Sequence, residues 1–200
     1  YYHRWKRSHL DIILKQDLIE LENVQHITSI ETLIQLLRKK VGAPISYSSL
    51  AEDLQCSDKP IKRWLAILET LYVVFKVVPY HRNISRAILK APKYYFYDIG
   101  QVPDDQGMKL ENLVACALLK EMHFREDCLG EKWNCYYLKN KDGREIDFLV
   151  TKEEKPSLML EVKWSDEKQS PNFSFFEKYI AGTRKIQIVN GYGPTEFTVC

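Results

Sequence analysis

The sequence predicts a mixed α+β or α/β chain with a helical first part and a sheet-forming second part. Apolar residues recur at helical spacing up to about residue 70, which favours amphipathic helices. Between residues 134 and 190, short apolar runs of strand length are separated by turn residues. Gly, Pro and Asp cluster at residues 100–107, between the two patterns, and predict a domain boundary there.

Composition limits the class of protein further. The chain has 200 residues, 45% of them hydrophobic, enough for one large domain or two small ones. Residues 1–100 hold 15 basic against 10 acidic side chains and residues 101–200 hold 14 against 17, which suggests two units with different partners or a chance fluctuation of surface charge. The longest apolar stretch, LYVVFKVV, is only strand-sized, so no membrane partner is expected. Five cysteines without a CxxC pattern favour a reducing, cytoplasmic location.

Residues 1–43 are expected to form a helical linker or lid segment. The spacing of apolar residues in HRWKRSHLDIILKQDLIELEN predicts a long opening helix whose beginning lies upstream, and the chain is expected to be a fragment because it starts without Met or a signal peptide. A second helix is predicted in TSIETLIQLLRKKVG, with Thr28 or Ser29 as its N-cap and Gly42 as its stop.

Residues 44–100 are expected to form a winged helix-turn-helix. Ser48 or Ser49 can cap a short helix that runs through Leu54, and Pro60 stands in the first turn of the next helix. An apolar strand in YVVFKVVPYH, a loop and a second strand in KYYFYDI follow. Helix, turn, helix and β-hairpin in this order are typical of a winged helix.

Basic side chains occur on the second helix of this segment and in the loop that would form its wing. Phosphates are bound by such cations, and a recognition helix presents its N-terminal residues to the DNA major groove. The alternative is that the winged helix only packs against a neighbouring module or a partner protein. The predicted nucleic-acid-binding residues are Lys59, Lys62, Arg63, Arg82 and Arg86.

Residues 101–200 follow the predicted order α-β-β-β-α-β. The helices are expected in MKLENLVACALLKEMHF and PNFSFFEKYIAG, and the strands in NCYYLKN, EIDFLV, SLMLEVKW and KIQIVN. Side chains alternate between the two faces of a strand, so pairing of EIDFLV with SLMLEVKW can place Asp147 beside Glu161 and Lys163.

Such a set of charges suits metal-assisted hydrolysis of a phosphodiester. Two carboxylates held together repel each other unless a cation lies between them, and a hard divalent metal takes oxygen ligands. A neighbouring lysine can stabilise the developing phosphoryl charge or orient a water molecule. Charges on the solvent face of a half-buried hairpin alternate in the same way, which is the alternative explanation.

Asp147, a loop and then Glu161-Val162-Lys163 resemble the D…(D/E)xK signature of the PD-(D/E)XK nuclease superfamily, the restriction-endonuclease-like fold. The α-β-β-β-α-β order also resembles the core of that superfamily. The resemblance implies catalytic roles for Lys163, Asp147 and Glu161, and Mg²⁺ or Mn²⁺ bound by Asp147 and Glu161. It adds Glu111, on the preceding helix, as a supporting metal ligand. Glu145 would share a face with Asp147 and is expected to support the ligands without binding the metal itself.

A wider set of segments resembles one family of prokaryotic AAA+ ATPases over essentially the whole chain. These segments are DLIELENV, YYFYDIG, LENLV, REIDFLV and LEVKWS, and in that family they follow a nucleotide-binding module. The resemblance implies an upstream ATPase module and DNA as partners, and it is compatible with an oligomer. No GxxxxGK[ST] occurs here, so ATP is expected to bind only in the upstream module.

Three functions remain as alternatives at this stage. The first is a divalent-metal-dependent nuclease with a DNA-binding winged helix. The second is a nuclease-like fold kept as a DNA- or protein-binding regulatory module, with weak or absent cleavage. The third is a regulator that only binds DNA.

Overall fold

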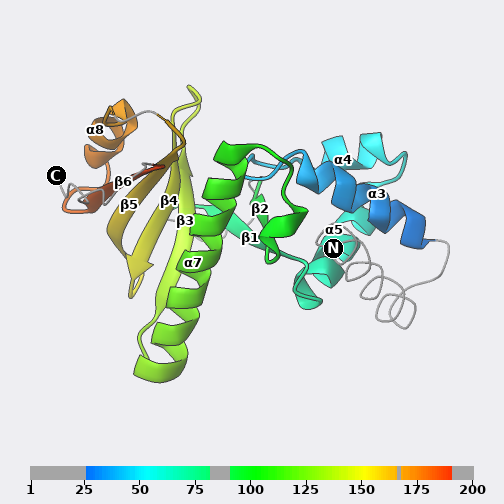
Figure 1. Ribbon diagram of the computed structural model, residues 1–200, viewed down its shortest axis with the longest axis horizontal. Helices are drawn as coiled ribbons and strands as arrows, with labels where there is room; N and C mark the ends of the chain where they lie inside the picture. Colours follow the sequence, from blue (N-terminus) through cyan, green and yellow to red (C-terminus); the bar gives the residue numbers. More distant parts are fainter. Residues whose placement is uncertain (1–25, 82–90, 166–167, 191–200) are drawn as a thin grey trace. The chain divides into compact units, whose positions relative to one another are not determined.

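A computed structural model describes residues 26–81, 91–165 and 168–190 (Figure 1). The long helix predicted within the first 25 residues lies outside the described residues. The contacts divide the chain into two compact units, the first made of residues 1–76 and 91–104 and the second of residues 77–90 and 105–200. The boundaries predicted at residues 43 and 100 stay predictions.

The first unit contains three helices, α3 (Ile27–Arg38), α4 (Tyr47–Asp53) and α5 (Asp58–Thr70). In α3, Ile30, Leu33, Ile34 and Leu37 recur at spacings of three and four residues and are all buried, as expected for an amphipathic helix. The helices themselves are therefore where the apolar periodicity predicts them.

The predicted helix caps were wrong by a few residues. Helix α3 begins after His26, whose side chain makes no capping hydrogen bond, so neither Thr28 nor Ser29 is the N-cap. The cap of α4 is Ser46, whose side chain accepts a hydrogen bond from the N–H of Ser49 at 3.4 Å. Ser46 has extended backbone torsions, which a cap residue needs, whereas Ser48 and Ser49 already lie inside the helix.

Two strands follow, β1 (Val74–Pro79) and β2 (Lys93–Phe96), and they are neighbours in a sheet. All four residues of β2 are buried. The ring of Phe75 stacks on that of Tyr95 with 5.7 Å between centroids. The order of helices and strands from residue 44 to residue 100 thus agrees with the sequence-based expectation.

The second unit contains α7 (Gln106–Leu129), β3 (Trp133–Lys139), β4 (Glu145–Lys152), β5 (Lys155–Lys163), α8 (Pro171–Glu177) and β6 (Arg184–Val189). This is the predicted α-β-β-β-α-β order. Asp105 caps α7 by accepting a hydrogen bond from the N–H of Met108 at 2.8 Å. Gly130 ends the helix with a φ of 65°, a left-handed conformation that glycine adopts without strain.

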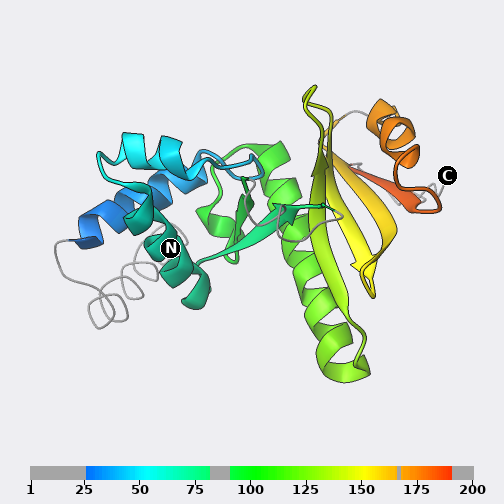
Figure 2. The ribbon, with the colours of Figure 1, turned by 180° about the vertical axis from the view of Figure 1, so that it is seen from behind.

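The described residues form a mixed α/β structure with five α-helices and one six-stranded sheet in the order β2-β1-β3-β4-β5-β6. Strands β3, β4 and β5 pair antiparallel, while β6 runs parallel to β5. Figures 1 and 2 show α7 against one face of the β3–β6 region and α8 over the other. Leu149 and Met159 form a buried cluster with Phe173 and Phe176 of α8, so their side of the strands is the α8 face.

Two further features concern cysteine and membranes. The four cysteines in the described ranges, Cys56, Cys116, Cys128 and Cys135, form no disulfide. None of the helices that the structure describes combines the length and the apolar character needed to cross a bilayer.

Candidate functional site

Asp147 and Glu161 lie side by side because of the register between β4 and β5. Phe148 pairs with Leu160 across the two strands, and continuing that register by one residue sets Asp147 opposite Glu161. Glu161 lies on the face of Met159, which is the α8 face, and Ser170 contacts it there. Strand β4 has a register shift between its Leu138–Ile146 and Tyr136–Leu149 pairs, so simple alternation does not assign the face of Asp147. Oδ2 of Asp147 also accepts a hydrogen bond from the N–H of Val162 at 2.8 Å, which fixes this carboxylate against β5.

The side chain of Glu161 is buried and is held by hydrogen bonds at one of its two oxygens. It is only 2% exposed, and its Oε1 accepts hydrogen bonds from Nζ of Lys163 at 2.9 Å and from Oγ of Ser170 at 3.2 Å. Its second oxygen, Oε2, is buried without a hydrogen-bond partner among the described residues. Burial and then the neighbouring charge of Asp147 raise the pKa of Glu161, while Lys163 and Ser170 act in the opposite direction.

Ser170 is a positioning residue that the sequence analysis missed. It is the N-cap of α8, and its N–H donates to Oε1 of Gln187 at 2.8 Å. Gln187 lies opposite Glu161 in the β5–β6 register and donates from Nε2 to the carbonyl oxygen of Lys168 at 2.9 Å. The serine before Pro171 is a sequence signal for a cap, but only the fold brings it to Glu161.

Glu111, predicted as a supporting metal ligand, belongs to a helix and not to the strands that carry Asp147 and Glu161. It lies in the second turn of α7, and α7 and α8 cover opposite faces of the strands (Figures 1 and 2). In the parts of the chain that the structure describes, no group of three or more His, Cys, Asp or Glu side chains could hold a metal ion. The role of Glu111 as a supporting metal ligand stays a prediction.

Glu145, predicted to support the ligands, forms an ion pair with Lys139 on the adjacent strand. The Nζ–Oε2 distance is 2.7 Å, and the two residues are direct partners in the β3–β4 register. Its backbone carbonyl accepts a hydrogen bond from Nδ2 of Asn172 at 2.8 Å, which ties the start of β4 to α8. The role of Glu145 in supporting the predicted metal ligand Asp147 stays a prediction.

The basic residues predicted to bind nucleic acid belong to the first unit or lie outside the described ranges. Lys59, Lys62 and Arg63 are exposed on α5, whose opposite side is buried through Ile61, Trp64, Leu65 and Leu68. Nζ of Lys62 lies 5.6 Å from the ring centroid of Tyr47, within reach of a cation–π interaction. Arg82 and Arg86 lie outside the described residues.

The carboxylate pair fits a divalent metal with two protein ligands. Mg²⁺ is commonly held by one or two carboxylates, with water and substrate phosphate oxygens completing its coordination. A buried carboxylate oxygen without a partner costs free energy that a cation beside it relieves, and Oε2 of Glu161 is such an atom. We refer to Asp147, Glu161 and Lys163 together as the carboxylate–lysine site.

The fold and this site define a mixed α/β chain whose second unit carries two neighbouring carboxylates and a lysine on two of its strands. The chain belongs to the family of the domain of unknown function DUF8612, which matches residues 2–104. Residues 106–198 match a second domain of unknown function, DUF4143. DUF4143 is often found in the C-terminal region of AAA-type ATPases, which indicates a C-terminal module of such a protein. No curated protein and no solved structure matched the chain.

Proposed function

We propose that this chain is the C-terminal part of an AAA-type ATPase, with a DNA-binding winged helix in its first unit and a metal-dependent nuclease domain of the PD-(D/E)XK type in its second. One observation carries the nuclease part. Asp147 and Lys163 both lie next to Glu161 where β4 runs beside β5, and the buried Oε2 of Glu161 has no partner among the described residues.

Each residue of the carboxylate–lysine site has a defined task in this proposal. Asp147 and Glu161 hold Mg²⁺ or Mn²⁺, which when bound polarises a phosphoryl oxygen and acidifies a water molecule. Lys163 is 39% exposed at its side chain, so its ammonium group can reach a phosphate oxygen while it remains beside Glu161. Ser170 and Gln187 keep the Glu161 carboxylate in place from the α8 side.

The DNA-binding part is supported by element order and exposure. Lys59, Lys62 and Arg63 lie in the first two turns of α5, the helix that precedes β1 and β2. Exposed cations at the start of such a helix match the way a recognition helix meets DNA phosphates and bases.

A second candidate is a nuclease-like module that binds but does not cleave. The observation that favours it is the direct Lys163–Glu161 ion pair, together with the lack of a third ligating side chain in the described residues. A lysine held by its own neighbouring carboxylate is less available to a phosphate, and a two-ligand metal site is weaker than a three-ligand one.

Cleavage of end-labelled DNA in the presence of Mg²⁺ or Mn²⁺ separates the two candidates. The nuclease predicts products that require the metal and disappear in Asp147→Ala and in Lys163→Ala. Lys155→Ala is a matched control because Lys155 is an exposed lysine at the start of the same strand. DNA binding without metal-dependent cleavage by the unmodified chain supports the binding module instead.

A further inference from the structure

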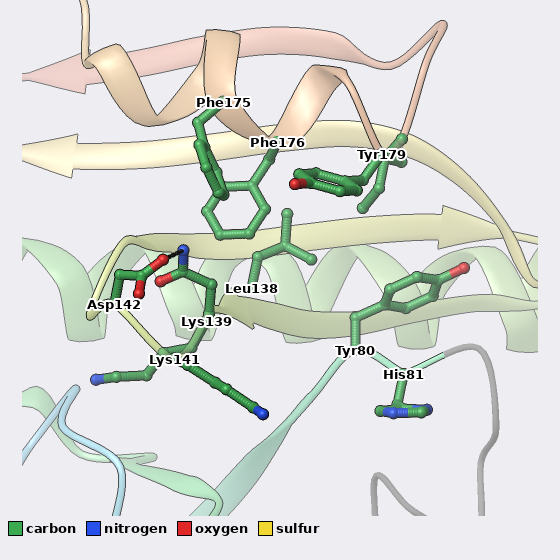
Figure 3. Close-up of a pocket in the computed structure, with 11 residues that line it drawn as sticks. Tyr80, His81, Leu138, Lys139, Lys141, Asp142, Phe175, Phe176 and Tyr179 are labelled. Atoms are coloured by element: carbon green, nitrogen blue, oxygen red, sulfur yellow. Dashed lines mark hydrogen bonds between the residues drawn. The ribbon is translucent and has the colours of Figure 1, made fainter.

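A cavity of about 650 Å³ lies in the second unit, beside the C-terminal half of α8 (Figure 3). Phe175, Phe176 and Tyr179 project from the α8 segment toward Leu138 of β3, and Tyr80 lies across the cavity, just after β1. The turn between β3 and β4 completes the lining. The volume falls within the roughly 300–1,000 Å³ typical of small-molecule sites.

One aromatic ring of this cavity, that of Tyr179, is exposed and yet held in place. Tyr179 is 62% exposed, although it contacts the ring of Phe175 with centroids 5.6 Å apart. Phe175 is fixed in turn by Phe176 at 5.2 Å and by the guanidinium of Arg144, which lies 4.8 Å from its centroid. An exposed ring that is already ordered stacks on a planar ligand with little further loss of conformational entropy.

Lysines line the edge of the same cavity. Lys139 is oriented by its 2.7 Å ion pair with Glu145, and Lys141 lies two residues further on, in the β3–β4 turn. The acidic residue of this turn, Asp142, accepts a hydrogen bond from Nδ2 of Asn140 at 3.1 Å. Rings beside cations are the combination with which proteins bind unpaired nucleotides, since bases stack and phosphates need positive charge. An apolar peptide side chain would use the rings but leave the lysines without a role.

The cavity and the carboxylate–lysine site are neighbours on the α8 face. Ser170, which bonds Glu161, and Phe176, which lines the cavity, are six residues apart on one helix, or about 9 Å at 1.5 Å per residue. Asn172 fastens the helix to β4 between them through its 2.8 Å hydrogen bond to the carbonyl of Glu145. The N-terminal end of α8 therefore lies at Glu161, and its C-terminal half lies at the cavity.

We propose that this cavity binds one unpaired nucleotide of a single-stranded nucleic acid, with its base against Tyr179 and Phe175 and a phosphate at Lys141. The choice of a nucleic-acid strand rests on the proposed nuclease function. The binding itself needs no metal, because neither the rings nor Lys141 belong to the carboxylate–lysine site.

Fluorescence anisotropy with the full chain tests the proposal, using a labelled single-stranded oligothymidylate and a labelled duplex in EDTA so that no cleavage occurs. Tyr179→Ala should weaken single-strand binding roughly 5- to 150-fold, the effect of removing a stacking ring, while Tyr179→Phe retains it. The slope of log affinity against log salt is negative, and Lys141→Ala should make it less steep by about 0.7. Tyr72→Ala is the matched control, since Tyr72 is 70% exposed and lies in the first unit.

Equal single-strand affinity in the unmodified chain and Tyr179→Ala, with thermal unfolding unchanged, would overturn the proposal. Equal weakening of duplex and single-strand binding would overturn its unpaired-nucleotide part. Because EDTA removes the metal, the outcome is independent of cleavage. Strand binding in EDTA that depends on Tyr179, with no products in the separate cleavage assay with Mg²⁺ or Mn²⁺, supports this site and refutes the nuclease. Metal-dependent cleavage in that assay, with strand binding indifferent to Tyr179, does the reverse.

Discussion

Replacing Glu161 with Gln should stabilise the folded chain at neutral and alkaline pH. The native side chain is 2% exposed, Oε2 lacks a partner among the described residues, and burial together with Asp147 raises its pKa. The folded state therefore holds this proton more tightly than the unfolded chain does. The stability that Glu161 contributes is present below the ordinary glutamate pKa and is lost as the pH rises through the folded value.

The size of the effect follows from the contacts of Glu161. A buried polar atom without a partner costs about 1–3 kcal/mol, and more when it carries charge. The substitution keeps a polar atom at this place but removes the charge, so it recovers the extra cost and ends the repulsion by Asp147. In return the variant loses the 2.9 Å ion pair with Lys163, which is worth about 0–1 kcal/mol because that lysine is 39% exposed. Ser170 can still donate to the amide oxygen. The expected net gain is about 1 kcal/mol, or about 2–4 °C in Tm for a chain of this length.

Thermal unfolding followed by circular dichroism at pH 4 and pH 8 measures this effect. The gain should be present at pH 8 and shrink at pH 4, where the native carboxylate is protonated. Glu177→Gln is a matched control, because Glu177 is a carboxylate on α8 that is 47% exposed and paired with Lys185. A lower Tm for Glu161→Gln than for the unmodified chain at pH 8 would mean that Lys163 and Ser170 satisfy the carboxylate, and would refute the reasoning.

Three further predictions concern other parts of the chain. Gly130→Ala should lower the free energy of unfolding, measured with urea, by about 1 kcal/mol. The cause is the φ of 65° at this residue, since an added Cβ meets no atom within 4 Å. Gly107 has no positive φ, so an equal loss in Gly107→Ala would contradict this reason. Lys152, Trp133 and Arg125 lower the pKa of Glu131 to about 2, so its stabilisation is present above the ordinary glutamate pKa and lost as the pH falls toward 2. Glu131→Gln should therefore flatten the acid side of the Tm–pH curve, and an unchanged curve would count against these contacts. Lys62→Ala should reduce the salt slope of duplex DNA binding by about 0.9, whereas the exposed Lys120→Ala on α7 should not; equal slopes would remove Lys62 from the DNA interface.

The sequence was sufficient to predict the features that depend on local periodicity. The order of elements in both units follows from the spacing of apolar residues, because helices and strands have different side-chain periods. The nearness of Glu161 and Lys163 was predictable for the same reason, since alternation places both on one face of β5. The register shifts in the ladders of β4 were not predictable, and they break the simple alternation around Asp147.

The features that the sequence could not provide depend on contacts between distant segments. The pattern of α7 predicts a helix that packs on the strands, but it does not say on which face. Ser170 and Gln187 reach Glu161 only through the packing of α8 and β6. The cavity likewise combines α8 with the β3–β4 turn and the end of β1, three segments with no shared sequence signal.

Titration of the full chain with Mn²⁺, followed by electron paramagnetic resonance of the free ion, tests the central claim that Asp147 and Glu161 form a metal site. The account predicts binding of Mn²⁺ that is lost in Asp147→Asn and in Glu161→Gln and retained in Glu177→Gln, with displacement by excess Mg²⁺. Equal Mn²⁺ binding in all four proteins, or none in the unmodified chain, would contradict it.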